Sequence, residues 1–112
     1  MDCIFCKIVN GEIPSSKVYE DDTVLAFNDI NPYAPVHILV IPKKHIGSAV
    51  ELTKEDNDLI AHIFEVIRII AEEQNLENGF RLVSNVGEDG GQTVKHLHFH
   101  ILGKKKFSES FG

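Results

Sequence analysis

The segment His96-Leu97-His98-Phe99-His100-Ile101-Leu102 alternates histidine with apolar residues. Alternation with period two predicts a half-buried β-strand. Residues two apart on a strand share a face, so the three imidazoles line one side while Leu97, Phe99 and Ile101 face the core. Three histidines in register indicate function more than packing. The segment alone fits a metal-binding strand, a catalytic row and a chance surface run.

Length and composition limit the classes of protein to consider. A chain of 112 residues is long enough for one core, so residues 1–112 are predicted to form a single domain. The net charge of −6 argues against a nucleic-acid partner, which needs a broad basic surface. No apolar run is long enough to span a bilayer, and the first residues lack a secretory signal. We therefore expect no membrane partner and a cytoplasmic location.

Cys3 and Cys6 have the Cys-x2-Cys spacing of half a zinc site, which needs two further ligands elsewhere. A redox pair of this spacing normally follows a strand in a βαβ unit, and only two residues precede Cys3. Two unpaired buried thiols are the remaining interpretation. Cysteines without an export signal indicate a reducing compartment.

The rest of the chain predicts an α+β fold. Short strands separated by turn residues indicate an antiparallel meander. The segment 48–74 contains one long helix, with Thr53 and Asp56 placed as a capping box. Its apolar stripe is wider than a small sheet needs, so part of it is expected to form a dimer interface. We assign no role to His62, at the edge of the stripe. The predicted strands are 17–20, 23–27, 37–41, 80–86 and 96–102.

The glycine-rich segment 87–93 lies directly before the histidine segment. It fits a plain turn, but glycine also lets backbone N–H groups approach an anion, so a phosphate cradle is the more specific interpretation. Neutral imidazole is a nucleophile at pH 7 and can attack phosphorus. Asp29, at the end of a strand, could bind two ribose hydroxyls, with Phe27 and Ile30 beside it to contact a base.

These residues together resemble the histidine triad (HIT) family. The match covers residues 3–103, and the chain is most similar to the Hint branch, which are dimeric nucleoside phosphoramidate hydrolases. The resemblance implies an antiparallel five-stranded meander sheet with one long helix and a short N-terminal helix, and a homodimer with a continuous sheet. The motifs that carry it are His96–Leu102, Phe27–Ile30, Ala34–His37, Val40–Ile46 and Gly90–Val94.

The resemblance also implies roles for individual residues. His98 would be the nucleophile, forming a nucleotidyl-histidine intermediate in the hydrolysis of the P–N bond of a purine nucleoside phosphoramidate. His100, Gln92 and Thr93 would contact the phosphate, and His37 and Asn85 would support the site. Asp29 would bind the ribose. The base pocket would consist of Ile4, Phe5, Ile8, Phe27, Ile30 and Leu39.

Some bacterial members that resemble this chain carry zinc, and the matching residues here are Cys3, Cys6, His45 and His96. Such a Cys2His2 set suits a closed structural site with one zinc per chain. The metal would organise the pocket without touching the phosphate.

Two features depart from the branch, and three alternatives stay open. Thr93 stands where serine is usual, and residues 103–112 form a C-terminal tail without the usual tryptophan and proline, so the leaving amine is open. One alternative is a dinucleoside polyphosphate hydrolase; in related transferases the triad ends in glutamine, which His100 argues against. A second is a non-enzymatic nucleotide-binding regulatory protein. A third is a zinc hydrolase with His98 and His100 as ligands.

Overall fold

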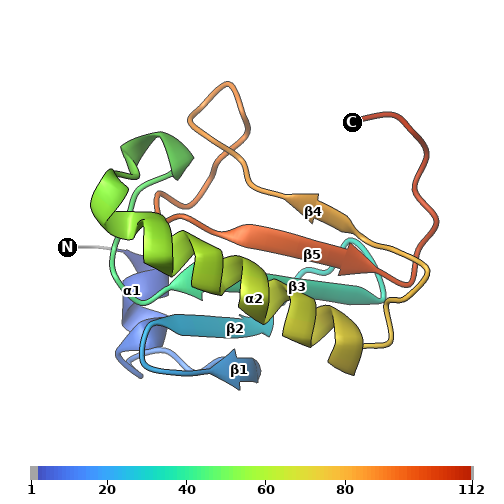
Figure 1. Ribbon diagram of the computed structural model, residues 1–112, viewed down its shortest axis with the longest axis horizontal. Helices are drawn as coiled ribbons and strands as arrows, with labels where there is room; N and C mark the ends of the chain where they lie inside the picture. The colour runs from blue at the N-terminus through green and yellow to red at the C-terminus, as the bar shows by residue number, and fades with distance from the viewer. Residues whose placement is uncertain (1–2, 112) are drawn as a thin grey trace.

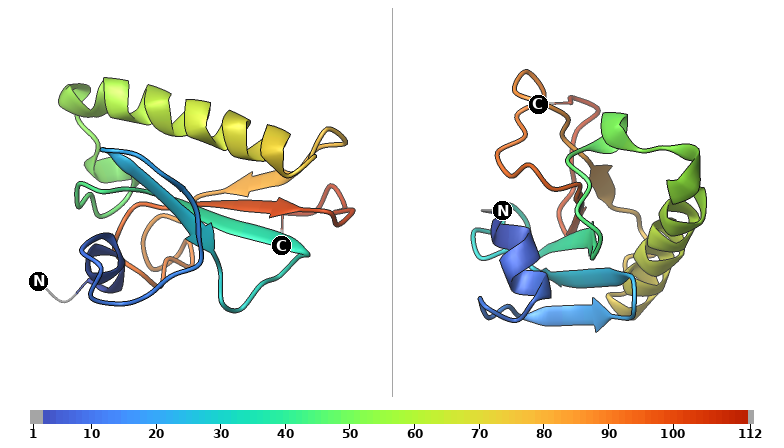
Figure 2. Two further views of the ribbon diagram at one scale, coloured as in Figure 1. Left: turned by 90° about the horizontal axis from the view of Figure 1, so that it is seen from below. Right: turned by 90° about the vertical axis from the view of Figure 1, so that its left-hand side faces the viewer.

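A five-stranded antiparallel sheet separates the two α-helices of the molecule (Figure 1). The computed structural model describes residues 3–111. The long helix α2 covers one face of the sheet and the short helix α1 lies on the other (Figure 2). The elements are α1 (Ile4–Val9), β1 (Lys17–Glu20), β2 (Val24–Asn28), β3 (Val36–Pro42), the 3₁₀ turns η1 (Ala49–Glu51) and η2 (Lys54–Asp56), α2 (Asn57–Glu73), β4 (Arg81–Val83) and β5 (Phe99–Gly103).

The strand order is β1-β2-β3-β5-β4, so the sheet is not the predicted meander. The first three strands lie side by side in the order of the sequence. After α2, the chain forms β4 at the edge of the sheet, and β5 then lies between β3 and β4. β5 carries the fully buried Ile101, whereas the three residues of β4 are half-buried, as suits a short edge strand. The α+β class, the five antiparallel strands, the long helix and the short N-terminal helix are confirmed.

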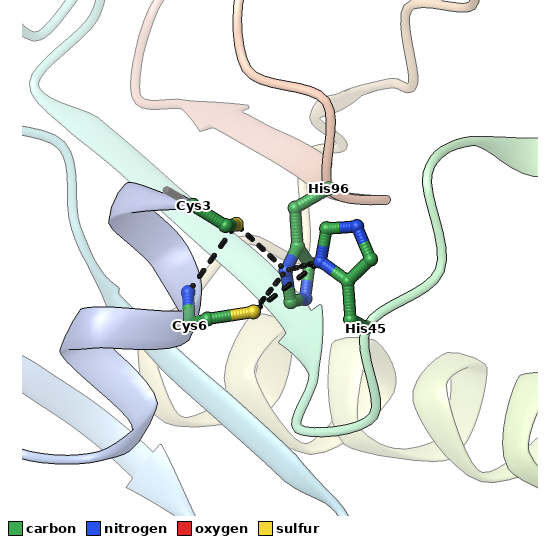
Figure 3. A group of neighbouring side chains, drawn as sticks. All are labelled: Cys3, Cys6, His45 and His96. Carbon is green, nitrogen blue, oxygen red and sulfur yellow. Dashed lines mark hydrogen bonds between the residues drawn. The ribbon is translucent and has the colours of Figure 1, made fainter. Parts of the chain in front are cut away.

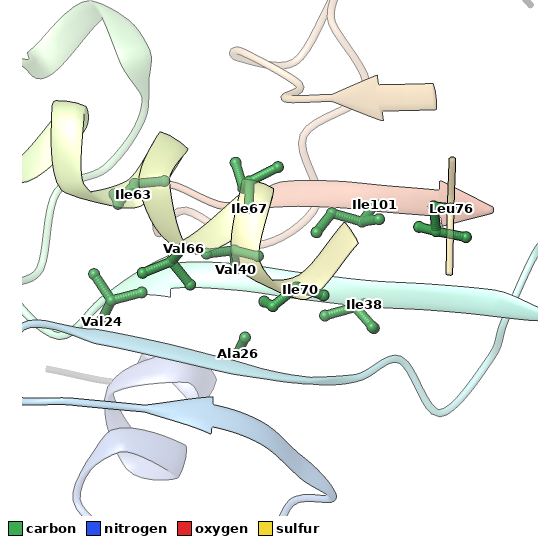
Figure 4. Packing of buried hydrophobic residues seen from close by; sticks show 10 residues of the cluster. All are labelled: Val24, Ala26, Ile38, Val40, Ile63, Val66, Ile67, Ile70, Leu76 and Ile101. Carbon is green, nitrogen blue, oxygen red and sulfur yellow. The ribbon is translucent and has the colours of Figure 1, made fainter. Parts of the chain in front are cut away.

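The main core lies between the sheet and α2 (Figure 4). Alternate residues of the central strands point toward the helix, and residues three or four apart on α2 point back, as the two periodicities require. The strands contribute Val24, Ala26, Ile38, Val40 and Ile101, and the helix contributes Ile63, Val66, Ile67 and Ile70. The residues between these positions on the same strands, His37, Leu39 and His100, point to the other face of the sheet, where the candidate site lies.

The helix is shorter than the predicted 48–74, because residues 49–56 form η1 and η2 before α2 begins at Asn57. The predicted capping box is present, but it caps the N-terminus of η2 and not that of α2. The Thr53 N–H donates to Asp56 Oδ2 at 3.0 Å. No helix within residues 3–111 is long and apolar enough to cross a membrane.

The histidine segment is a strand only in its second half, since β5 begins at Phe99. The last pairs are Val40 with Phe99 and Val83 with His100. Continuing this register would place Ile41 opposite His98 and Pro42 opposite Leu97, and Pro42 has no N–H to donate. His96 and His98 therefore precede the strand, which corrects the prediction of one strand over 96–102. The other predicted strands exist with shifted ends, and β4 has three residues in place of the seven predicted over 80–86.

Candidate active site and metal centre

His98 is held with its Nε2 atom free to react. Its Nδ1 lies 2.7 Å from the carbonyl oxygen of His96. A carbonyl only accepts, so Nδ1 carries the proton and the Nε2 lone pair is unprotonated in the neutral ring. The ring is 6% exposed and packs at right angles to Phe5, with 5.1 Å between ring centroids, while the ring of His100 lies 5.0 Å away. This is the arrangement a nucleophilic imidazole requires.

His37 and His100 form a hydrogen-bonded chain next to His98. The backbone N–H of Tyr33 donates to His37 Nδ1 at 3.1 Å, so the proton of His37 is on Nε2. His37 Nε2 donates to His100 Nδ1 at 2.9 Å, which leaves the proton of His100 on its own Nε2. Burial, with His98 and His37 nearby, lowers the pKa of His100 to about 4. Burial also lowers the pKa of His37, although Asp29 opposes the shift. Both rings are therefore neutral donors at pH 7.

Asp29, His37 and His100 also lie close enough together to suggest a second metal site, but the hydrogen bonds argue against it. Metal binding through His37 Nε2 would remove that atom's proton while Nδ1 accepts from Tyr33, which would leave an imidazolate. Asp29 Oδ2 lies 3.5 Å from His37 Nε2, and Oδ1 accepts the Asn31 N–H at 2.8 Å. Among residues 3–111, His98 belongs to neither group of potential ligands, which weakens the zinc hydrolase interpretation.

Cys3, Cys6, His45 and His96 meet at the start of α1 with their ligand atoms converging (Figure 3). A tetrahedral zinc ion bound at its usual bond lengths separates its nitrogen and sulfur ligands by about 3.3–3.8 Å. Here His45 Nδ1 and His96 Nδ1 are 3.2 Å apart, Cys6 Sγ lies 3.3 Å from His45 Nδ1 and 3.6 Å from His96 Nδ1, and Cys3 Sγ lies 3.4 Å from His96 Nδ1. Four of the six distances between the predicted ligand atoms are thus close to those around a tetrahedral zinc ion, and all the ligand atoms lie within 4.8 Å of one another.

Local structure presents these ligand atoms. Cys3 is the N-cap of α1, and its sulfur accepts the Cys6 N–H at 3.4 Å, which sets both thiols on the first turn. His96 Nε2 donates to the Pro42 carbonyl at 2.8 Å, so its Nδ1 lone pair faces the sulfurs. Burial is the main cause that raises the pKa of the Cys6 thiol. A bound cation would oppose this shift by favouring the thiolate.

Phe5 connects the candidate metal ligands to His98. It lies between the two cysteines on α1, and its ring centroid is 5.9 Å from that of His96, 5.1 Å from that of His98 and 5.6 Å from that of Phe27. The N-terminal turn therefore packs directly on the histidine segment.

The glycine loop is closed mainly by its own hydrogen bonds. The N–H groups of Gly87, Gly91 and Gln92 are used inside the loop, with Gln92 Oε1 accepting from Gly87 at 2.9 Å. Gln92 Nε2 donates to the carbonyls of Gly47 and Val94, and Asn85 Nδ2 donates to Gly90 at 2.7 Å. A Cβ at Gly90 would lie 2.3 Å from the Val86 oxygen, so only glycine fits there. Of the predicted phosphate contacts in the loop, the Thr93 hydroxyl is exposed and has no hydrogen-bond partner in the described part of the chain.

The predicted base-pocket residues separate into two groups. Phe5, Ile8, Phe27 and Leu39 belong to one buried cluster under the site. Ile4 is 49% exposed and Ile30 is 91% exposed, so they lie on the surface. Sequence reasoning missed two residues. The backbone N–H of Tyr33 donates to His37, and the hydroxyl of Ser84 donates to the His98 carbonyl. Tyr33 acts through its backbone, which leaves no side-chain pattern, and a serine in an apolar strand was the one available signal for Ser84.

Comparisons with known proteins agree with this geometry. The family model described as "Scavenger mRNA decapping enzyme C-term binding" matches residues 2–111. A histidine triad protein from Clostridium difficile is 59% identical and superposes with a TM-score of 0.94 over 98% of this chain and 96% of its own. A HIT family hydrolase from Legionella pneumophila is 46% identical, with a TM-score of 0.96 over 99% of this chain and 100% of its own. A 14 kDa zinc-binding protein from Zea mays is 44% identical over 94% of this chain and 84% of its own.

Proposed function

Because this chain belongs to the histidine triad (HIT) family, we propose that it hydrolyses the P–N bond of purine nucleoside phosphoramidates, as the Hint branch does. The observation that carries the proposal is the free Nε2 of His98, fixed by the bond from Nδ1 to the His96 carbonyl. The similarity to a HIT family hydrolase supports hydrolase chemistry at this site.

The reaction would take two displacements at phosphorus. His98 Nε2 attacks, the P–N bond breaks, and the amine leaves with the bonding electron pair and takes a proton from solvent. Water then attacks the nucleotidyl-histidine, the bond from phosphorus to Nε2 breaks, and the nucleoside monophosphate leaves. His100 donates its Nε2 proton in a hydrogen bond to a phosphoryl oxygen, and His37 keeps that proton in place by donating to Nδ1.

Other residues would bind the nucleotide. The Thr93 hydroxyl reaches the phosphate from the loop, while Gln92 and Asn85 hold the loop in shape. Asp29 accepts the ribose hydroxyls beside His37, where its carboxylate is partly exposed. The apolar cluster around Phe5 and Phe27 underlies the purine, and its lack of polar groups predicts weak discrimination between adenine and guanine.

Zinc, when bound by Cys3, Cys6, His45 and His96, would supply structural cross-linking and no chemistry at phosphorus. The likeness to a zinc-binding protein supports the assignment. These residues hold α1 against the histidine segment, and Phe5 passes that constraint to the ring of His98.

We also propose that the protein is a homodimer with a continuous sheet. β4 is a short edge strand, and beside it Phe64 of α2 is 47% exposed although its ring packs on Phe99. A second copy would cover both the edge and this apolar face. The free thiols of Cys3 and Cys6 suit a reducing, cytoplasmic compartment.

The decisive experiment is mass spectrometry of the protein after brief mixing with a purine nucleoside phosphoramidate. We expect a nucleotidyl adduct on His98 in the wild type and none in His98→Ala, which should still bind nucleoside monophosphate. Normal turnover by His98→Ala, or an adduct on another residue, contradicts the mechanism. Binding without any adduct or turnover in the wild type would instead support the regulatory interpretation.

A further inference from the structure

Ser84 makes a hydrogen bond to the residue proposed as the nucleophile. It follows β4 directly, and its hydroxyl donates to the backbone carbonyl of His98 at 2.8 Å. The bond is partly buried and joins positions fourteen apart in the sequence. Ser84 is therefore placed to act on His98 through the backbone.

The bond occurs where both neighbouring ladders end. β5 pairs with β3 as far as Phe99 and with β4 as far as His100, so His98 lies just outside each ladder. Continuing the β4 register would bring Asn85 opposite His98, but β4 ends at Val83 and the side chain of Ser84 supplies the donor. The donor to the His98 carbonyl is therefore the Ser84 hydroxyl and not a backbone N–H of β4.

Two hydrogen bonds hold the segment on the N-terminal side of His98, and the ladders of β5 begin at Phe99 on its C-terminal side. The Leu97 N–H donates to the Ile46 carbonyl at 2.6 Å, and His96 Nε2 donates to the Pro42 carbonyl. The ring of His98 is itself tied backward, to the His96 carbonyl. Ser84 holds the peptide on the C-terminal side, and so limits rotation of the backbone that carries the ring.

We propose that Ser84 is a positioning residue that aligns His98 Nε2 for attack on phosphorus. The inference rests on the proposed function and adds a residue that acts on His98 through its backbone carbonyl. Reacting atoms must approach in line within a narrow range, and a displacement of about 1 Å can cost a large factor in rate. Loss of the hydroxyl should therefore slow adduct formation while nucleotide binding is retained.

The test compares Ser84→Ala with Ser84→Thr, which restores a hydroxyl, and with Ser16→Ala. Ser16 is the matched control, because its hydroxyl also takes part in one hydrogen bond, accepting from Asn28 Nδ2 at 3.0 Å, on another part of the surface. Rapid-quench mass spectrometry measures the rate at which the His98 adduct forms from a purine nucleoside phosphoramidate. We expect that rate to fall on the order of tenfold in Ser84→Ala. It should recover in Ser84→Thr and be unchanged in Ser16→Ala. The Kd for adenosine monophosphate and the zinc content should not change in Ser84→Ala.

Three results would overturn the inference: wild-type adduct formation in Ser84→Ala, no recovery in Ser84→Thr, or a parallel loss of nucleotide binding. If Ser84→Ala does not fold, Ser84→Cys, which keeps the volume with a weaker donor, should give an intermediate rate. A wild type that binds nucleotide but forms no adduct contradicts the proposed function instead. The imidazole ¹⁵N shifts of His98 then decide the role of Ser84, since they should report a changed ring environment in Ser84→Ala and none in Ser16→Ala.

Discussion

The hydrogen atoms on the imidazoles of His37, His98 and His100 determine which ring nitrogens can donate and which can accept. His98 points its proton at a carbonyl, so its second nitrogen is free. His100 receives a hydrogen bond from His37 and therefore presents a donor to the site. The same side chain thus presents an unprotonated nitrogen at His98 and an N–H donor at His100.

Asp29→Asn tests ribose recognition. One oxygen of the carboxylate holds the Asn31 N–H at 2.8 Å, and the asparagine oxygen can keep that bond. The other carboxylate oxygen becomes an amide nitrogen, which cannot accept from a ribose hydroxyl, and the charge is lost, so ribonucleotide affinity should fall by roughly tenfold. Calorimetry should show little change for 2′,3′-dideoxynucleotides. Asp58→Asn, at the exposed start of α2, is the control, and equal weakening of both ligand types would show that Asp29 does not read the ribose.

At the scale of elements, a network of half-buried hydrogen-bonded side chains joins α2 to the β1–β2 hairpin. His62 Nε2 lies 2.6 Å from Asp21 Oδ2, and the Tyr19 hydroxyl donates to the same oxygen. The bond to Asp21 raises the pKa of His62 despite some burial, and Glu65 adds to it. Burial opposes ionisation of Asp21, but hydrogen bonds from Tyr19 and His62 lower its pKa well below the usual range. The bond to Asp21 also raises the pKa of Tyr19 to about 12.

This network predicts a pH-dependent contribution to stability. A raised His62 pKa stabilises the fold fully below its unfolded value of about 6.5, and this is lost as pH rises through the folded value. The Asp21 contribution is present above about pH 3.9 and is lost in acid. His62→Gln should therefore lower the free energy of unfolding by about 0.5–1 kcal/mol more at pH 5.5 than at pH 9. This corresponds to a difference of a few degrees in Tm. Lys17→Gln, which removes an exposed ion pair with Glu20, should show no such difference. A pH-independent effect of His62→Gln contradicts the assignment.

The proposed zinc site at the start of α1 is tested by Cys3→Ser combined with Cys6→Ser. Two of the four ligands are lost, so zinc should disappear and Tm should fall, because binding free energy of the metal is folding free energy. Adduct formation on His98 should fall only in part, since Phe5 still packs on its ring. Metal analysis, thermal melts and adduct rates measure the three effects.

His45→Gln is the companion variant, which should lose zinc with both thiols intact. Stoichiometric zinc in the double cysteine variant would mean that the ligand set is wrong. Loss of zinc and of all adduct formation in a folded, nucleotide-binding protein would mean that the metal takes part in catalysis.

At the scale of the whole molecule, the proposed dimer predicts a mass twice the 12.5 kDa of the chain. Phe64→Glu places a charge on the apolar face beside β4 and should give a monomer by light scattering, with a lower and less concentration-dependent Tm. Val50→Glu changes another exposed apolar residue, on η1, and should leave the dimer intact. A wild-type protein that stays monomeric at high concentration would contradict the proposed homodimer.

Local patterns predicted much of this protein because their physical causes are local. The apolar segment 37–41 predicted a strand, which the structure has as β3 with one more residue at each end, the 3.6-residue stripe predicted α2, and the Thr53 and Asp56 pair predicted a capping box. The zinc ligands came from a spacing and from resemblance, and the structure brings all four together. The chemistry of the site was visible because histidine, cysteine and glycine are rarely grouped for packing alone.

Only the tertiary structure determined how those segments meet. Strand order depends on which strand buries both faces, so β5 lies between β3 and β4 although it comes last. The alternating segment 96–102 was expected to be one strand, but hydrogen bonds from Ser84 and to Ile46 and Pro42, distant in sequence, hold its first half outside the sheet. Within that first half, the bond from His98 Nδ1 to the His96 carbonyl leaves Nε2 of His98 unprotonated. Residue types and their periodicity determine which groups are available, whereas the protonation and direction of each imidazole depend on partners that only folding brings near.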